Sequence, residues 1–368
     1  MSAKTKKKSI FKTIMKILLI FILIALIAVF VIGYYITSKE MDKKFFRVEY
    51  PDASLDPDYH YDHYQAEYPR HEVSFRSGDN VLKGYIYGLN NDKGVIVFGH
   101  GVSHGHERYL STINALVDCG WRVFTYDGTG TCTSEGKNTV GLGQSVIDMD
   151  RAVTFVEDNS VFDDMPIFVL GHSWGGYASA AVLGFDHDIT ASCSLSGYNK
   201  PFTELCEFAD RKFGEKSVAI YPFIWLYNKV QFGRYSSISA VDSINKNDTP
   251  ILIVHGDNDE TIDYNGASII AQKGHITNPN AEYYTFEAED KDTHNGMFKT
   301  TEYYTYYNTE LKSKDNEMKS KYGDDIPDDV YAEYVASINK DLYNAPNPEL
   351  IGLIDSFFEK QLKAEPAE

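Results

Sequence analysis

Residues 168–180, FVLGHSWGGYASA, hold the pattern in this chain that is most able to do chemistry. Ser173 stands between Gly171 and Gly175, after an apolar run and before a series of small residues. The pattern predicts a strand, a sharp turn that carries the serine, and a helix, because a Cβ at either glycine would crowd so tight a bend. Free N–H groups at the start of that helix would favour a developing oxyanion. Ser173 is therefore predicted to be a nucleophile.

A serine hydroxyl needs two partners: a histidine that takes its proton and a carboxylate that orients the histidine. His294 is the candidate base, because it follows the last predicted strand, in the segment EDKDTHNGMF. The candidate acids are Asp257, Asp259 and Glu260, in the segment HGDNDET after a buried strand. His275 is the rival base, but it precedes the last strand and is expected on the surface, at the wrong edge of the sheet.

This order of serine, acid and histidine resembles the α/β-hydrolase superfamily, and more closely its branch of serine esterases, lysophospholipases and aminopeptidase-like enzymes. In that branch the motif H-G-x-x-D ends on the triad acid, which falls on Asp259, and the triad histidine falls on His294. The resemblance also implies an oxyanion hole formed by the backbone N–H groups of Trp174 and Val102. It implies catalysis without a metal or an organic cofactor.

The resemblance covers about residues 71–298 and the last predicted helix. Residues 126–136, YDGTGTCTSEG, are similar to the family's D-x-x-G-x-G-x-S turn, which shapes the wall of the pocket. Cys132 stands where the family has its second glycine, so this turn departs locally from the family's pattern.

Two groups of residues raise the question of a metal. His100, His104 and His106 are spaced H-x3-H-x-H, but the one carboxylate beside them, Glu107, is expected to open the next helix, and no metal is predicted. The cysteines show no C-x-x-C spacing, which argues against a zinc site and a dense disulfide framework. Buried free thiols, or one or two disulfides, remain open for Cys119, Cys132, Cys193 and Cys206.

The N-terminus has the composition of a membrane anchor. Residues 1–16 carry six lysines, and residues 17–37 form an uncharged, apolar run of the length that crosses a membrane once. The lysines predict a cytoplasmic N-terminus and an outer catalytic domain. A cleaved signal peptide is the alternative, but its apolar region should be shorter and end in small residues, whereas this run ends in Tyr34-Tyr35-Ile36. An uncleaved, single-pass anchor is favoured.

The acidic residues all lie beyond that run. The 53 aspartates and glutamates follow Ser38, together with all but six of the 35 lysines and arginines. A domain so acidic is repelled by nucleic acid, which is excluded as a partner. The same repulsion acts between most of its surface and anionic lipid.

Strand-like and helix-like segments alternate along residues 71–368, which predicts an α/β fold with a mostly parallel central sheet flanked by helices. Residues 38–70 are polar and are expected to form a stalk. The alternation stops at about 198–243, where two aromatic-rich helices are expected as a cap over the carboxyl ends of the strands, the edge at which such sheets bind ligands. A second insertion, about 300–345, precedes the closing helix.

Together these features predict a membrane-anchored serine hydrolase that acts on a small acyl ester, with lipid or envelope-linked esters among the candidates. Aromatic residues of the cap are candidates for an acyl pocket: Phe202, Phe208, Tyr221, Phe223, Trp225 and Tyr227. One alternative is a peptidase for small peptides, with Glu204 and Glu207 near the amino terminus of its substrate. Another is a binding protein without catalytic activity on the same scaffold. The oligomeric state is not predicted.

Overall fold

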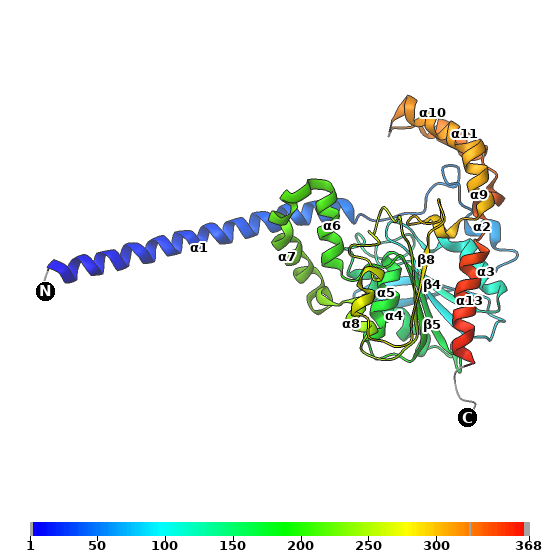
Figure 1. Cartoon of the computed structure of the whole chain (residues 1–368), viewed down its shortest axis with the longest axis horizontal. Coiled ribbons are helices and arrows are strands. Elements are labelled where there is room, and N and C mark those ends of the chain that lie inside the picture. Colours follow the sequence, from blue (N-terminus) through cyan, green and yellow to red (C-terminus); the bar gives the residue numbers. More distant parts are fainter. Residues whose placement is uncertain (1–2, 324, 364–368) are drawn as a thin grey trace.

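The computed structural model describes residues 3–323 and 325–363, and Figure 1 shows them as one α/β body from which a long N-terminal helix extends. In this described part the body is built on a sheet of eight strands in the order β1-β2-β4-β3-β5-β6-β7-β8. β2 runs antiparallel to both of its neighbours, and all the other neighbours are parallel. The strands are β1 (Arg70–Ser77), β2 (Asn80–Tyr87), β3 (Val95–Gly99), β4 (Arg122–Tyr126), β5 (Ile167–His172), β6 (Ile189–Leu195), β7 (Ile251–Gly256) and β8 (Ala281–Phe286).

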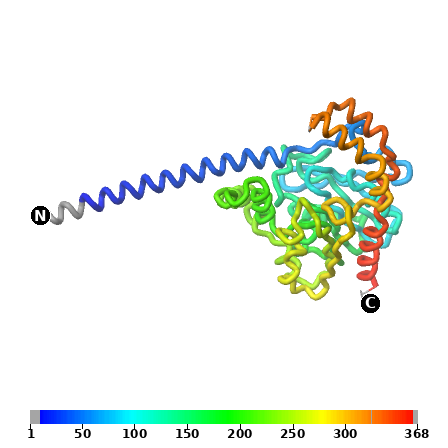
Figure 2. Tube along the Cα trace, turned by 45° about the horizontal axis from the view of Figure 1, so that its top comes forward, coloured from blue at the N-terminus to red at the C-terminus, as the bar shows by residue number. Residues whose placement is uncertain are grey.

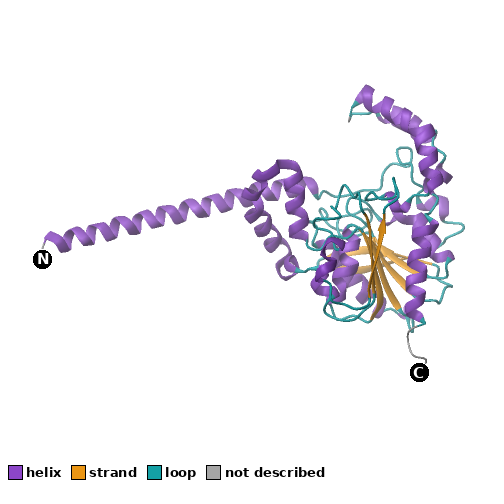
Figure 3. Ribbon diagram, viewed as in Figure 1, coloured by secondary structure: helices purple, strands orange, loops and turns teal. Residues whose placement is uncertain are grey.

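Helices cover both faces of the sheet, as Figure 3 shows with the sheet seen edge-on between them. α3 (Leu110–Asp118) and α13 (Pro348–Leu362) pack on one face, and α4 (Gln144–Glu157), α5 (Trp174–Ala181) and α8 (Ala240–Ile244) on the other. β3 is buried on both sides because its side chains alternate: Val95 and Val97 join one core, and Ile96 and Phe98 the other. The predicted α/β architecture is confirmed.

The insertion between β6 and β7 is helical, as predicted. α6 (Pro201–Phe213) and α7 (Tyr221–Phe232) are joined by a 3₁₀ segment (Gly214–Ile220), and together they form the part of the chain called the cap below. The sequence pattern of residues 265–273 also favours a helix, but they form no α-helix, and a 3₁₀ turn (Ile270–His275) occupies the end of this segment. The reason is tertiary: the carbonyl of Ala267 accepts from Asn199 N–H at 2.7 Å, and Ile269 N–H donates to Gly197 at 2.9 Å, so these groups cannot complete a helical ladder.

Residues 45–70 lie along the body and do not form the expected stalk. Val48 pairs with Thr131, and the Arg47 guanidinium donates to the carbonyls of three residues of the turn after β4, Cys132, Ser134 and Gly136. A short helix, α2 (Tyr61–Tyr64), follows. The segment's polarity reflects these hydrogen bonds to the body as well as its solvent contact.

The second insertion forms a separate arm of helices, which Figure 2 shows on the opposite side of the body from the cap. Its elements are α9 (Thr301–Tyr306), a π-helical turn (Tyr307–Leu311), α10 (Lys312–Tyr322), α11 (Asp328–Ala336) and α12 (Lys340–Asn344).

The N-terminal helix α1 (Ala3–Lys44) contains the apolar run, residues 17–37, and extends beyond both of its ends. By length and composition, the part Ile10–Lys44 is able to cross a membrane, and the side chains of its apolar stretch are exposed. The helix continues past residue 37 because the residues there are good helix formers and Lys43 pairs with Glu40 at 2.7 Å.

Candidate active site

Ser173 lies on the turn between β5 and α5, as the sequence predicts. Its backbone has φ 56° and ψ −107°, a left-handed conformation that is strained for any residue except glycine. A Cβ on Gly171 would collide with the backbone of Gly175, and a Cβ on Gly175 would collide with that of Gly99. The turn therefore exists only with glycine at both positions, and it presents the serine at the carboxyl edge of the sheet.

Asp259 and His294 form a hydrogen-bonded pair. Asp259 follows β7, His294 follows β8, and the two strands are parallel neighbours that end at the same edge. His294 Nδ1 lies 2.7 Å from Asp259 Oδ2, and both side chains are buried. Asp259 Oδ1 accepts the backbone N–H groups of Thr261 and Ile262, which fixes the plane of the carboxyl group.

Asp259 carries its charge in a buried place. Burial alone would raise the pKa of its carboxyl, but hydrogen bonds from His255 and His294 outweigh burial and hold the pKa well below its usual range. His255 Nε2 lies 3.1 Å from the carboxylate. The sequence analysis did not single out His255, although it begins the HGDND segment that was used to place the acid.

The other candidates for acid and base lie elsewhere. Asp257 is exposed, and Glu260 accepts the backbone N–H of His294 at 3.2 Å and does not reach its ring. His275 is exposed at the end of its 3₁₀ turn, as expected. The geometry therefore selects Asp259 from the three candidate acids.

Ser173 and His294 are both buried at the carboxyl edge of the sheet, with 7% and 6% of their surfaces exposed. Among the described residues no hydrogen bond joins the Ser173 hydroxyl to the His294 ring. A connection runs through the residue before the serine, because His172 Nε2 donates to the His294 carbonyl at 3.0 Å and the two rings lie 4.8 Å apart. Catalytic hydrogen bonds of this kind often form fully only when substrate is bound.

Tyr109 links this histidine pair to the loop after β3. Its hydroxyl accepts the N–H of Gly101 at 3.0 Å and donates to His172 Nδ1 at 2.9 Å. Burial lowers the pKa of His172 far below its usual value, so it stays neutral and holds this tautomer. The loop after β3, the serine turn and the loop that carries His294 are thus held together by one buried chain of hydrogen bonds. Nothing in the sequence marks Tyr109, which stands in an ordinary helix start.

Val102, Ser173 and Trp174 line one small cavity, which has a volume of about 60 Å³. Within the described residues the backbone N–H groups of Val102 and Trp174 have no hydrogen-bond partner, so both are available to bind an oxyanion. The rest of the lining is mostly apolar: Leu142, Tyr198, Leu205, Phe208 and Ile262, with Lys44, Glu204 and Thr261. Of the six cap aromatics considered from the sequence, Phe208 lines this cavity.

Two of the three histidines that follow β3, His100 and His106, have separate partners. His100 donates from Nδ1 to the Gly101 carbonyl and accepts Gly128 N–H at Nε2, and burial lowers its pKa to about 4. His106 pairs with buried Asp127 at 2.9 Å. In the part of the chain that the structure describes, no group of three His, Cys, Asp or Glu side chains could hold a metal ion, and the four cysteines, all in that part, are free.

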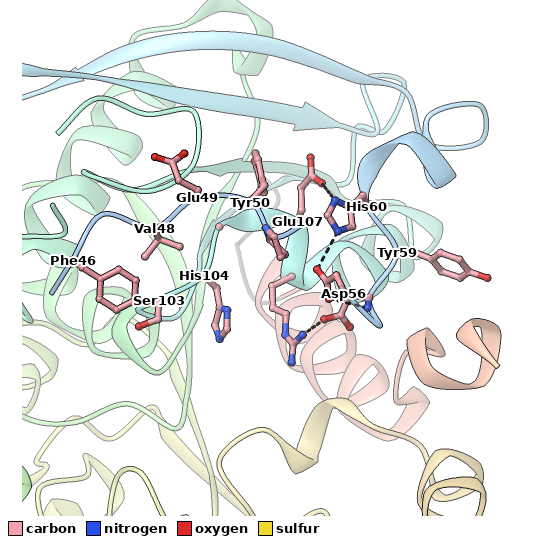
Figure 4. Close-up of a pocket in the computed structure, with 14 residues that line it drawn as sticks. Phe46, Val48, Glu49, Tyr50, Asp56, Tyr59, His60, Ser103, His104 and Glu107 are labelled. Carbon is pink, nitrogen blue, oxygen red and sulfur yellow. Dashed lines mark hydrogen bonds and ion pairs between the residues drawn. The ribbon is translucent and has the colours of Figure 1, made fainter. Parts of the chain in front are cut away.

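A second cavity, of about 320 Å³, adjoins the loop after β3 (Figure 4). The loop gives Ser103 and His104 to this cavity and Val102 to the one that holds Ser173. The opposite wall comes from residues 46–60, the segment expected to be a stalk, and is held by ion pairs of His60 with Asp56 and Glu107. No sequence pattern indicates this cavity, because its two walls, residues 46–60 and 103–108, are far apart in the chain.

Comparisons with known proteins agree with this architecture. Residues 90–197 match a hydrolase family described as serine aminopeptidase, S33. An esterase of Pyrococcus furiosus is 18% identical with a TM-score of 0.50, over 75% of this chain and 98% of its own. Est1E of Butyrivibrio proteoclasticus, solved with ferulic acid bound, is 19% identical with a TM-score of 0.47, over 60% of this chain and 90% of its own. No curated protein sequence matches the chain. The esterase of Pyrococcus furiosus shares the fold, and at this identity the likeness extends no further.

Proposed function

This chain has the α/β-hydrolase fold, and we propose that it belongs to that superfamily and is a membrane-anchored serine hydrolase that cleaves carboxylic esters. The observation that carries the proposal is the hydrogen bond between His294 Nδ1 and Asp259, with Ser173 on a strained turn next to His172, whose ring lies 4.8 Å from that of His294. A histidine oriented by a buried carboxylate close to a serine is the arrangement that activates a hydroxyl.

The mechanism follows from these positions. His294 Nε2 takes the Ser173 proton while the serine oxygen attacks the ester carbonyl, and Asp259 stabilises the imidazolium. The oxyanion that forms is bound by the N–H groups of Val102 and Trp174, each contributing about 3–4 kcal/mol to the transition state. His294 then protonates the leaving alcohol, and water releases the acid from the acyl-enzyme.

An ester is the preferred substrate because the Ser173 cavity is mostly apolar and the one acid among its described lining residues, Glu204, is neutral. Burial raises the pKa of Glu204 to about 8, so this carboxyl, which lines the Ser173 cavity, is largely protonated at pH 7. A neutral carboxyl is a weak partner for the ammonium group of a peptide. An apolar acyl chain fits the surrounding leucine, isoleucine and aromatic side chains.

A peptidase that acts on amino-terminal residues is the second candidate. It is supported by the family match and by Glu204 Oε2, a buried oxygen with no partner among the described residues. A bound ammonium group would supply that partner and lower the pKa of Glu204. A catalytically inactive binding protein is less consistent with an intact set of Ser173, Asp259 and His294.

Helix α1 supports the anchoring part of the proposal. Its apolar side chains are exposed, which is stable in lipid and unfavourable in water. With six lysines at its N-terminus, the positive-inside rule places that end in the cytoplasm and the hydrolase domain outside.

The proposal is tested by labelling the purified full-length protein in detergent with a fluorophosphonate probe, followed by assays with short acyl esters and with aminoacyl amides. We expect labelling of the wild type, none in Ser173→Ala, and turnover of the esters at least tenfold faster than that of the amides. Faster turnover of the amides would favour the peptidase. A folded wild type that neither reacts with the probe nor cleaves either substrate would contradict the hydrolase.

Glu204 also predicts a pH dependence of stability. Its pKa is raised by burial to about 8 in the folded protein, from 4.5. The folded state therefore binds more protons than the unfolded state between these values, so the free energy of unfolding falls as the pH rises from 4.5 to 8. We expect this fall to be smaller in Glu204→Gln, measured by urea unfolding at several pH values. Glu215→Gln, at an exposed position of the cap, is the control and should follow the wild type.

A further inference from the structure

The cap packs against the anchor helix within the apolar part of that helix. The rings of Phe30 in α1 and Phe223 in α7 lie 5.6 Å apart, edge to face. Phe223 also covers Gly33 so closely that any side chain there would collide with its ring. At 1.5 Å per residue, Phe30 and Gly33 lie about 10 and 6 Å before the end of the apolar run at residue 37. If α1 crosses a membrane, α7 lies below the membrane surface.

The cap has exposed apolar side chains, as a helix that lies in the membrane interface requires. In Figure 1, α7 runs across α1, so it lies along the plane of a membrane that α1 crosses. Interfacial helices bury their apolar side about 5–10 Å into the boundary between headgroups and acyl chains, which matches the depth of the contact with α1. Large apolar side chains of the cap that would be costly in water are exposed there: Phe213, Val218, Trp225 and Val230.

A cavity of about 280 Å³ lies between α1 and the cap, and it is called the anchor cavity below. Ile36 and Met41 of α1 form one wall, and Leu205, Ala209 and Ile224 of the cap form the other. Its volume is close to the lower end of the range for small-ligand sites, about 300–1,000 Å³. One wall of this cavity is therefore built from the anchor helix, outside the hydrolase fold.

The anchor cavity adjoins the cavity of Ser173. Lys44, Leu205 and Phe208 line both of them. The Lys44 ammonium lies 3.3 Å from the centroid of the Phe208 ring, so this pair and Leu205 stand between the two spaces. Phe208 is half-buried, and a change of its rotamer would widen the connection.

The charges around the anchor cavity suit a phosphate group. Lys44, Lys212 and Lys216 line it, with Glu40 as the one carboxylate. The outer domain as a whole is strongly acidic, so these lysines are a local exception beside the membrane-crossing helix. Lysines beside a membrane attract anionic lipid headgroups.

We propose that the anchor cavity binds the acyl chain of a phospholipid from the membrane that holds α1, and leads it past Phe208 to Ser173. The inference rests on the proposed function, because it assumes that α1 crosses a membrane and that the site cleaves an acyl ester. The cap lies in the lipid–water interface, and α1 acts as one wall of the substrate path as well as an anchor.

Trp225 offers a direct test of the cap's position. It is 52% exposed, whereas the other two tryptophans, Trp121 and Trp174, are 0% and 2% exposed. In full-length protein reconstituted into vesicles of phosphatidylcholine and phosphatidylglycerol, lipids brominated near the headgroup end of the acyl chain should quench at least a third of the tryptophan fluorescence. Trp225→Phe is the matched control and should lose this quenching. Equal fluorescence in brominated and ordinary lipid would overturn the placement of the cap.

The lipid path is tested with Ser173→Ala protein in the same vesicles, using a monoacyl glycerophospholipid that carries a photoreactive diazirine on its acyl chain. We expect adducts on peptides from residues 36–44 and 205–224. Ala209→Phe, which fills the anchor cavity, should lower their yield at least fivefold, and Ala219→Phe, the same change at an exposed cap position, should not. Adducts confined to other peptides, or a yield that Ala209→Phe leaves unchanged, would overturn the path. Because this assay needs no turnover, it separates failure of the lipid site from failure of the hydrolase.

Discussion

Replacing Asp259 with asparagine is expected to lower kcat for a short ester by about 10⁴-fold, the size of effect that follows when a triad histidine is held in the wrong tautomer. Asp259 Oδ1 accepts the N–H groups of Thr261 and Ile262 at 2.9 and 2.8 Å. An asparagine keeps its carbonyl oxygen there, so its NH₂ group must occupy the place of Oδ2, 2.7 Å from His294 Nδ1. That NH₂ donates to Nδ1, and the proton of the ring then stays on Nε2, which can no longer accept one from Ser173.

Asp257→Asn is the matched control for this prediction. Asp257 lies two residues earlier in the same loop and is exposed, so the same isosteric change should alter kcat by less than about twofold. Both variants are compared by ester hydrolysis and by circular dichroism, which shows whether the fold is kept. Comparable losses in the two variants would mean that the loop, and not the tautomer of His294, limits the reaction.

The fold and the serine turn were predictable because their causes are local. Gly171 is required by a contact with Gly175, four residues further along, and alternating strands and helices determine a mostly parallel sheet. The acid was predictable as a set of three candidates, all on one loop. Only the tertiary structure shows which of them is the acid, because Asp259 is buried and Asp257, two residues earlier in the same loop, is exposed.

Contacts between distant segments were not predictable. From sequence, Arg47 is expected to be a surface residue of a polar segment. Its guanidinium instead donates to three backbone carbonyls nearly ninety residues away. Tyr109 reads as an ordinary aromatic residue and joins the loop after β3 to His172. The contact of Phe223 with α1 shows the same limit, since a cap helix and an anchor have sequence patterns that are independent of each other. The anchor cavity lies where the cap meets α1, and neither sequence pattern indicates it.

Substituting Gly175 with alanine is expected to lower the free energy of unfolding by about 4 kcal/mol or more, among the largest effects of a single methyl group. The added Cβ would overlap the carbonyl of Gly99 at the end of β3, closer than any Cβ approaches in a real protein. Neither backbone segment can move away from the other. Gly175 N–H also donates to the His100 carbonyl at 3.1 Å, and Gly99 pairs within the centre of the sheet. Relief requires β3 and α5 to separate, which opens the core on both sides of Ser173.

Gly352→Ala tests whether the loss at Gly175 comes from this collision and not from the chemistry of a glycine-to-alanine change. Gly352 lies in the interior of α13 with no atom within 4 Å of the place of a Cβ. Alanine there should raise the free energy of unfolding by about 0.5–1 kcal/mol, because it restricts the unfolded chain. Urea unfolding of both variants should therefore show changes of opposite sign. A Gly175→Ala protein as stable as the wild type would mean that the serine turn has room for a side chain, and that the strain at Ser173 is not imposed by the packing of β3 against α5.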